Sequence, residues 1–300
     1  MIQTKNNNKT GSGGRKDILM SRLVFLVSMS GVVIIVFILG FLVANGMPVL
    51  KEVSLSEIFL SYDWYPAEEP PALGMLPLIA GTMATTLISS ILALPVAVAL
   101  AVFTAEIAPR WMRNFFKVLI ELLGFLPSIV LGFLGMMVLA PRMQEALGLA
   151  TGLNLLTASI LLGFLVIPVV ASLSEEAISA VPQELRDASY ALGATRWETI
   201  KKVVIPHALS GMLSAALLGV MRSLGETMVV LMVAGGSAII PKIFTDPVRP
   251  LTSTIAAEMG ETPVGSVHYH ALFFAGLILL MITLIINLAS FYIEKRGKRA

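Results

Sequence analysis

Long apolar runs alternate with shorter polar segments along the chain, and this pattern predicts membrane-spanning helices. A helix needs about 20 consecutive apolar residues to cross the hydrocarbon core of a bilayer. Six runs reach this length: about 23–44, 76–103, 118–140, 153–173, 208–234 and 271–293. The second and fifth runs exceed the minimal length, so we expect tilt or an interruption in them. The pattern therefore predicts an all-α integral membrane protein with six transmembrane helices.

The composition agrees with this pattern and excludes an ordinary soluble enzyme. Hydrophobic residues make up 56% of the 300 residues and charged residues 13%, against about 25% charged residues in an average soluble domain. The chain contains no cysteine, which excludes disulfides, zinc–thiolate sites, iron–sulfur clusters and thiol catalysis. The first apolar run is too long for a signal peptide and lacks a clear cleavage site, so we expect it to be retained as a membrane anchor.

The distribution of basic residues predicts the orientation of the helices. Of the 21 Lys and Arg residues, 16 lie before the first run, between the second and third, between the fourth and fifth, or after the sixth. With six spans these segments share one side, and basic residues accumulate on the cytoplasmic side. We therefore expect a multi-pass protein of the bacterial cytoplasmic (inner) membrane with both termini in the cytoplasm. Residues 1–17 are predicted to form a disordered cytoplasmic tail, residues 18–296 the transmembrane domain, and residues 297–300 a basic cytoplasmic tail.

The cytoplasmic loop 174–206 is predicted to fold into two short helices. Pro182 is suited to open the first helix, and Gly193 supplies a C-terminal stop. Residues 195–198, Thr-Arg-Trp-Glu, form a capping box that starts the second helix. Pro206 ends this helix or bends it into the fifth span. Such a helix pair has a shape suited to binding a partner, and a structured connector without a partner is the alternative.

Arg222 and Glu226 lie inside the fifth apolar run and are the candidate site residues. Charged side chains within membrane spans are costly and usually face the protein interior or a water-filled cavity. Their spacing of four places them on one helix face, which allows an ion pair. A guanidinium matches two oxygens of a tetrahedral oxyanion, and the carboxylate can hold it when no anion is present. The alternative is a buried pair that only fixes helix packing.

Small residues recur every fourth position in the same run, at Gly211, Ala215, Gly219 and Ser223. Such a stripe lets two membrane helices approach closely. The spacing leaves open whether the partner helix belongs to this chain or to a second membrane chain.

Prolines and a carboxylate interrupt the other runs. Pro95, Pro127 and Pro168 lie within the second, third and fourth runs, and each can kink its helix. Glu121 lies near the start of the third run, where it is expected to cap the helix or to act in a gate.

The external segment 45–75 carries several carboxylates and three aromatic residues, Tyr62, Trp64 and Tyr65. We expect a solvated loop with aromatic anchors at the membrane surface, and binding of an external partner is the alternative. His268 and His270 are expected to be solvated loop residues rather than a metal site.

The cytoplasmic loop also carries a recognisable signature. Asp187-Ala188-Ser189, then Gly193 and Pro206, resembles the loop of binding-protein-dependent ABC-importer permeases. That signature consists of Glu-Ala-Ala, three residues, Gly, nine residues and Ile-x-Leu-Pro, and the spacing matches throughout, with four conservative replacements. In that family the loop fits a groove on a cytoplasmic ATPase and transmits its closure to the membrane helices.

A second signature narrows the resemblance. Residues 221–228, Met-Arg-Ser-Leu-Gly-Glu-Thr-Met, resemble the fifth span of phosphate-importer permeases of the PstC type. Sulfate and molybdate permeases usually continue with an aromatic residue and Gly after the Glu, and the PstA type usually has Glu-Thr-Ala-Pro. Residues 106–109 and 121–128 also resemble the PstC type. The likeness extends from about residue 16 to residue 295.

The resemblance implies a type I ABC-importer permease fold and a translocation role in ATP-driven phosphate import. It assigns the substrate pathway to Arg222, Glu226 and Thr227. It assigns the ATPase coupling loop to Asp187, Ala188, Ser189, Gly193 and Pro206. A permease for molybdate, tungstate or sulfate is the alternative.

The implied partners are a sister permease of the PstA type, a cytoplasmic ATPase dimer of the PstB type and an external phosphate-binding protein of the PstS type. Phosphate and membrane lipid are the expected small-molecule partners, with no nucleic acid, cofactor or metal. The chain shows no convincing ATPase motif of its own. An ion-gradient carrier would not need the cytoplasmic helix pair, and an intramembrane enzyme would need a catalytic constellation within the spans.

Overall fold

The computed structural model describes residues 13–297 and the side chains of residues 20–292. Among the described residues, six helical segments are long and apolar enough to cross a membrane: Met20–Lys51, Leu76–Ile107, Ser128–Leu147, Leu155–Ser179, Arg196–Leu224 and Val267–Tyr292. The predicted all-α fold with six spans is confirmed. The terminal segments 1–12 and 298–300 lie outside the described residues, and the helix that precedes the first loop begins at Gly13.

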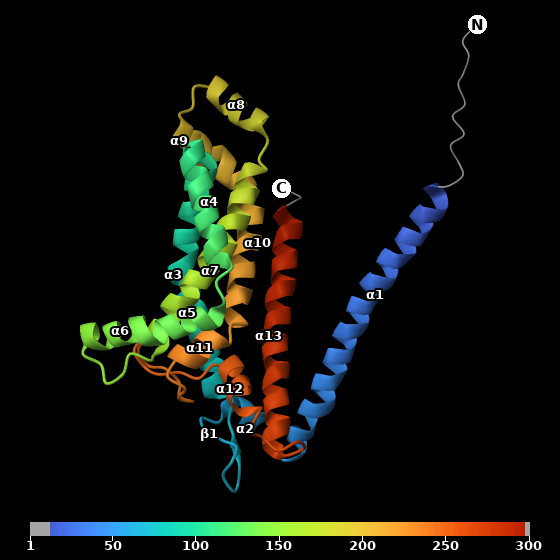
Figure 1. Cartoon of the computed structure of the whole chain (residues 1–300), viewed down its shortest axis with the longest axis vertical. Helices are drawn as coiled ribbons and strands as arrows, with labels where there is room; N and C mark the ends of the chain where they lie inside the picture. Colours follow the sequence, from blue (N-terminus) through green and yellow to red (C-terminus); the bar gives the residue numbers. More distant parts are fainter. Residues whose placement is uncertain (1–12, 298–300) are drawn as a thin grey trace.

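Three helices form the centre of the molecule (Figure 1). They are α3 (Leu76–Val102), α7 (Leu155–Ser179) and α10 (Ile205–Leu224). Helix α3 continues as the π-helical segment η2 (Phe103–Ile107). Small side chains line their contacts, and Ala93, Ala97 and Ala215 are at most 1% exposed. Pro95 and Pro168 lie inside α3 and α7 without ending either helix. The close approach of small residues therefore holds this centre together.

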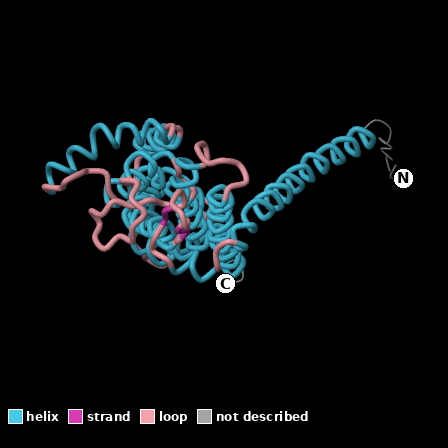
Figure 2. Tube along the Cα trace, turned by 90° about the horizontal axis from the view of Figure 1, so that it is seen from below, coloured by secondary structure: helices cyan, strands magenta, loops and turns pink. Residues whose placement is uncertain are grey.

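Two long helices lie beside this centre. They are α1 (Gly13–Gly46) and α13 (Val267–Gly297), which contact each other and, through α13, contact α10. Figure 2, seen along the molecule, shows α1 projecting away from the remaining helices. The side chains of α1 that the structure describes are largely exposed and apolar, as expected for a surface that faces lipid or another membrane chain.

The third predicted span, 118–140, is wrong as a single helix. The structure divides this region at residues 125–127, because Pro127 disfavours a helical conformation at the residue before it. The resulting elements are α4 (Arg110–Gly124), α5 (Ser128–Leu134), the π-helical η3 (Gly135–Leu139) and α6 (Ala140–Leu147). In Figure 1, α4 runs beside α7, whereas α5 and α6 turn across the bundle.

The interruption expected in the fifth span lies at its charged pair. Helix α10 ends at Leu224, residues 225–227 are not helical, and α11 (Met228–Val233) follows. The chain then passes through a loop to α12 (Leu251–Glu258), which packs against α11 and α13.

The two ends of the bundle have different structures, and we call them the hairpin end and the helix-pair end. The hairpin end holds η1 (Met47–Lys51), α2 (Leu55–Leu60) and the antiparallel strands β1 (Trp64–Tyr65) and β2 (Ala72–Leu73). The helix-pair end holds α8 (Gln183–Ala191), α9 (Arg196–Thr199) and the π-helical η4 (Ile200–Val204). They lie at opposite ends of the bundle in Figure 1.

Candidate functional site

Arg222 and Glu226 form the predicted ion pair, with 2.5 Å between Arg222 Nη1 and Glu226 Oε2. The pair does not lie along one continuous helix as expected, because α10 ends at Leu224 and Glu226 lies in the break before α11. The two side chains differ sharply in burial: that of Arg222 is 42% exposed and that of Glu226 is 4% exposed. The pair therefore joins a buried carboxylate to a guanidinium at the surface of the chain.

Further hydrogen bonds fix the position of Glu226. Its Oε1 atom accepts from the backbone N–H of Met228 at 3.2 Å and of Val229 at 3.5 Å, at the start of α11. Its carbonyl oxygen accepts from Thr252 Oγ1 of α12 at 2.8 Å. Free N–H groups at a helix start stabilise a carboxylate. The carboxylate consequently keeps partners even if the guanidinium moves away.

Thr227, the third predicted pathway residue, is half-buried in the same break. Its hydroxyl donates to the carbonyl oxygen of Gly225 at 3.4 Å and makes no described contact with Arg222. Gly225 and Met228 on either side are exposed. The break thus presents a small exposed surface around the guanidinium.

The small-residue stripe packs within this chain. A Cβ atom added at Gly219 would lie 2.3 Å from Cγ2 of Val170, and one added at Gly211 would lie 2.6 Å from Cβ of Ala177. Both neighbours belong to α7. Ser223, at the end of the stripe, hydrogen-bonds with Ser89 of α3, with 2.7 Å between their hydroxyl oxygens. The stripe therefore packs α10 against α7 and α3, and its last residue lies next to Arg222 in the sequence.

The helix pair forms as predicted. Pro182 precedes α8, Gly193 adopts a φ of 83°, and Thr195 and Glu198 complete a capping box at α9. Pro206 does not end the second helix of the pair but lies at the start of α10, into which that helix continues. The preceding turn, η4, is π-helical, and its wider spacing accommodates the ring as the chain continues into α10.

The signature residues of the loop lie on or near this helix pair. Asp187 Oδ1 accepts from Gln183 Nε2 at 3.0 Å, and the hydroxyls of Ser189 and Thr199 are 2.9 Å apart. Asp187, Ala188, Gly193 and Pro206 are exposed and Ser189 is half-buried. At the tip, Leu192 is 90% exposed and Trp197 61% exposed. Exposed large apolar side chains flanked by polar residues are typical of a protein-binding surface.

A largely buried polar cluster near the hairpin end was not predicted from the sequence. Glu258 accepts from Trp64 Nε1 at 3.2 Å, lies 2.8 Å from Arg249 Nη1 and lies 2.7 Å from His268 Nε2. The expectations of a surface anchor for Trp64 and a solvated His268 are therefore wrong: Trp64 is 4% exposed, and the His268 side chain 18%. These residues belong to four separate segments, so no local spacing in the sequence could have indicated their contact.

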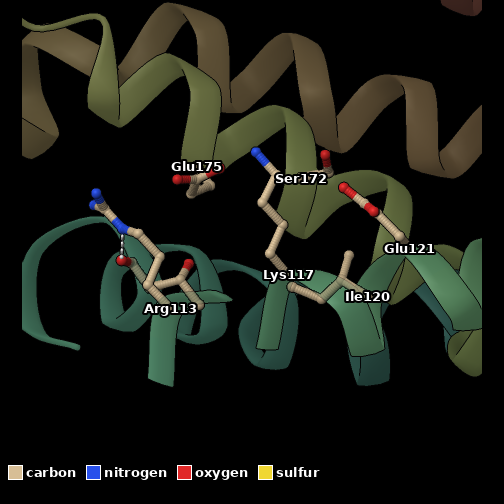
Figure 3. Close-up of a pocket in the computed structure, with 7 residues that line it drawn as sticks. Arg113, Lys117, Ile120, Glu121, Ser172 and Glu175 are labelled. Carbon is tan, nitrogen blue, oxygen red and sulfur yellow. Dashed lines mark hydrogen bonds between the residues drawn. The ribbon is translucent and has the colours of Figure 1, made fainter. Parts of the chain in front are cut away.

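A second cluster of charged side chains lies between α4 and α7 (Figure 3). Arg113, Lys117 and Glu121 follow each other along α4, and Ser172 and Glu175 face them from α7 around a small cavity. Glu121 lies in the last turn of α4 rather than at a helix start, so the capping role expected for it is wrong. Figure 3 shows the Lys117 side chain extending toward α7 between the two carboxylates.

Solved transporter structures share this fold. A bacterial alginate ABC transporter aligns over 94% of this chain and 96% of its own, with a TM-score of 0.64 and 14% sequence identity. The inward-facing MetNI methionine ABC transporter aligns over 74% of this chain and 97% of its own, with a TM-score of 0.58 and 20% identity. The chain has the type I ABC importer permease fold that these structures share.

Sequence comparison identifies the family. The profile described as "Binding-protein-dependent transport system inner membrane component" matches residues 97–299. The probable ABC transporter permease protein YqgH of Bacillus subtilis is 39% identical, covering 82% of this chain and 80% of its own. The phosphate transport system permease protein PstC of Haemophilus influenzae is 31% identical, covering 86% of each chain. This chain therefore belongs to the family of binding-protein-dependent transport system inner membrane components, as a transport component and not a catalytic one.

Proposed function

We propose that this chain is the translocation-pathway permease subunit of an ATP-driven importer of inorganic phosphate. Relatives named PstC, a phosphate transport system permease protein, match most of its length at about 31% identity. The observation that carries the proposal is the Arg222–Glu226 pair, in which a half-exposed guanidinium adjoins a buried carboxylate at a helix break. A guanidinium binds a tetrahedral oxyanion through two parallel hydrogen bonds.

The geometry suits transient binding. When phosphate approaches, Arg222 exchanges one charge-assisted contact for another, while Glu226 keeps its hydrogen bonds to the α11 backbone. When phosphate leaves, the guanidinium returns to the carboxylate. The retained carboxylate also repels the anion, which favours its release. A conduit needs a site that is favourable enough to enter and weak enough to leave, and this pair meets both requirements.

The partners follow from the two ends of the bundle. The helix-pair end carries the signature loop and exposed apolar residues, so it binds an ATPase subunit that supplies the hydrolysis. The hairpin end lies on the opposite, external side and receives phosphate from a binding protein. A sister permease supplies the other wall of the pathway. We expect both termini in the cytoplasm on this proposal, and the distribution of basic residues supports that orientation.

Uptake of labelled phosphate by cells that lack the gene, with and without the gene restored, tests the proposal. Restored uptake should be inhibited by excess arsenate and not by sulfate or molybdate. Restored uptake of sulfate or molybdate instead of phosphate would refute the assignment of the substrate.

Variants of the charged pair test the role of Arg222. Arg222→Gln should abolish uptake while the complex still assembles, whereas Arg110→Gln, which changes an exposed arginine at the start of α4, should leave uptake unchanged. If the Arg222→Gln complex fails to assemble, or if it transports normally, the pathway role of this residue is wrong.

A further inference from the structure

Three arginines from three different elements contact the π-helical segment η2, at the C-terminal end of α3. Arg113 of α4 donates through Nε to the Thr104 carbonyl oxygen at 2.7 Å and through Nη2 to that of Ala105. Arg196 of α9 donates to the carbonyl oxygen of Glu106. Arg186 of α8 pairs with the Glu106 carboxylate, with 2.7 Å between Nη2 and Oε1. We call Arg113, Arg186 and Arg196 the arginine cluster.

Arg186 attaches α8 to the bundle through polar contacts, beside the partly buried Leu185, which packs against apolar residues of the bundle. Among the residues of α8, all of which the structure describes, Arg186 is the one that is buried. Besides Glu106, it donates to the carbonyl oxygens of Ile178 at 3.0 Å and of Val181. One guanidinium therefore joins α8, the end of α7 and the end of α3. The Glu106 side chain is 10% exposed, so loss of either partner leaves a charge without its counter-ion in a largely buried place.

The segment that receives these bonds is suited to move with them. A π-helical turn at a helix end lacks the regular backbone bonding of an α-helix, and its free carbonyl oxygens are satisfied here by arginines, which also complement the negative end of the helix dipole. A cavity of about 460 Å³, open to solvent and lined in part by all three arginines and by Glu106, lies beside the cluster. The helix pair therefore has room to shift relative to the bundle.

We propose that the arginine cluster and Glu106 are the connection through which a displacement of the helix pair reaches α3 and α4. The inference rests on the proposed function, because an ATPase bound at the helix pair supplies the displacement. A shift of α8 and α9 pulls Glu106 through Arg186 and Arg196. The movement passes to α4 through Arg113, and α4 carries Lys117 and Glu121 along α7 (Figure 3). These residues are positioning residues and make no contact with the transported anion.

The complete transporter reconstituted in lipid vesicles tests this connection. Phosphate uptake and ATP hydrolysis are measured together, and the number of phosphates moved per ATP is compared between variants. Glu106→Gln keeps the shape of the side chain and removes its charge. We expect the complex to assemble and hydrolyse ATP, with the phosphate-to-ATP ratio reduced on the order of tenfold. A side chain that only stabilised the fold would lower uptake and hydrolysis together and leave this ratio unchanged.

Two further variants make the outcome decisive. Glu145→Gln is the matched control, because it makes the same change at an exposed carboxylate of α6, away from the helix pair, and it should keep the normal ratio. Arg196→Gln changes an exposed residue and leaves the Arg186–Glu106 ion pair intact. If the Glu106→Gln complex does not assemble, the phosphate-to-ATP ratio of Arg196→Gln therefore tests the inference alone. A normal phosphate-to-ATP ratio in Arg196→Gln and in any assembled Glu106→Gln complex would overturn the inference. If the unmodified transporter moves no phosphate, the proposed function fails instead.

Discussion

Gly193 offers the sharpest test of the helix pair, because the cost of replacing it comes from the backbone alone. Its φ of 83° lies in the left-handed region, and a Cβ atom added there would meet no other atom within 4 Å. The turn it forms is closed by Gly193 N–H donating to the Tyr190 carbonyl oxygen at 2.9 Å and Ala194 N–H donating to that of Ser189 at 3.2 Å. A substitution therefore strains the turn without creating a clash.

The expected magnitude follows from this conformation. A residue other than glycine in the left-handed region costs about 1–3 kcal/mol, and a β-branched residue lies at the upper end of that range. Since about 1.4 kcal/mol corresponds to a factor of ten, a cost of about 2–3 kcal/mol for Gly193→Val should reduce the population of the native turn by about 30- to 150-fold. Asparagine tolerates the left-handed conformation, so Gly193→Asn should have a small effect.

Co-purification of the ATPase and phosphate uptake measure the outcome. Gly193→Val should lower both, and Gly193→Asn should keep both near normal. Gly148→Val is the matched control, because Gly148 also has a positive φ, 62°, and open space around it but lies after α6, away from the helix pair. Equal behaviour of the Val and Asn variants at Gly193, or an equal loss of ATPase binding in Gly148→Val, would refute the reasoning.

Three other predictions test packing, the buried polar cluster and a loop. Gly219→Val should destabilise the purified protein by about 1–3 kcal/mol through overpacking against α7, and Gly31→Val, in open space, should leave its thermal unfolding unchanged. Glu258→Gln should weaken the bonds that hold Trp64, and faster proteolysis of the hairpin end would show this. Two backbone N–H groups lower the pKa of the Asp246 carboxyl. The stabilising contribution of this carboxylate should therefore be present at neutral pH and disappear as the pH falls through its folded-state pKa. Hydrogen exchange of the loop measures this: the unmodified protein and the Asp246→Asn variant should differ at neutral pH and become alike at low pH.

The sequence predicted those elements whose causes are local. Apolar runs of about 20 residues marked the spans, and the glycine turn and capping box of the helix pair depended on neighbouring residues alone. The position of the third span was wrong, because the apolar character continues past residue 125 while Pro127 breaks the helix. Apolar composition does not distinguish one straight helix from two helices at an angle.

Long-range polar contacts were the part that the sequence could not supply. Glu106 and Arg186 are 80 residues apart, and Trp64 and Glu258 are 194 apart. The ion pair of Arg222 with Glu226 was predictable because four residues separate them, yet its burial asymmetry depends on α11 and α12, which fold over Glu226 from beyond the break. The local spacing identified the pair, and only the tertiary fold determined which partner is exposed and which is buried.

That asymmetry bears on how the pathway is completed. Arg222, Gly225 and Met228 lie on the surface of this chain, and a charged side chain at the surface of a membrane helix requires water or polar protein groups around it. Since the small-residue stripe on α10 is already occupied by α7, that face of the helix is closed to a second chain. In the importer proposed above, the sister permease lies over the face carrying the guanidinium and leaves a water-filled space between the two chains. The proposed function therefore predicts that the anion passes between two permeases rather than through the centre of either.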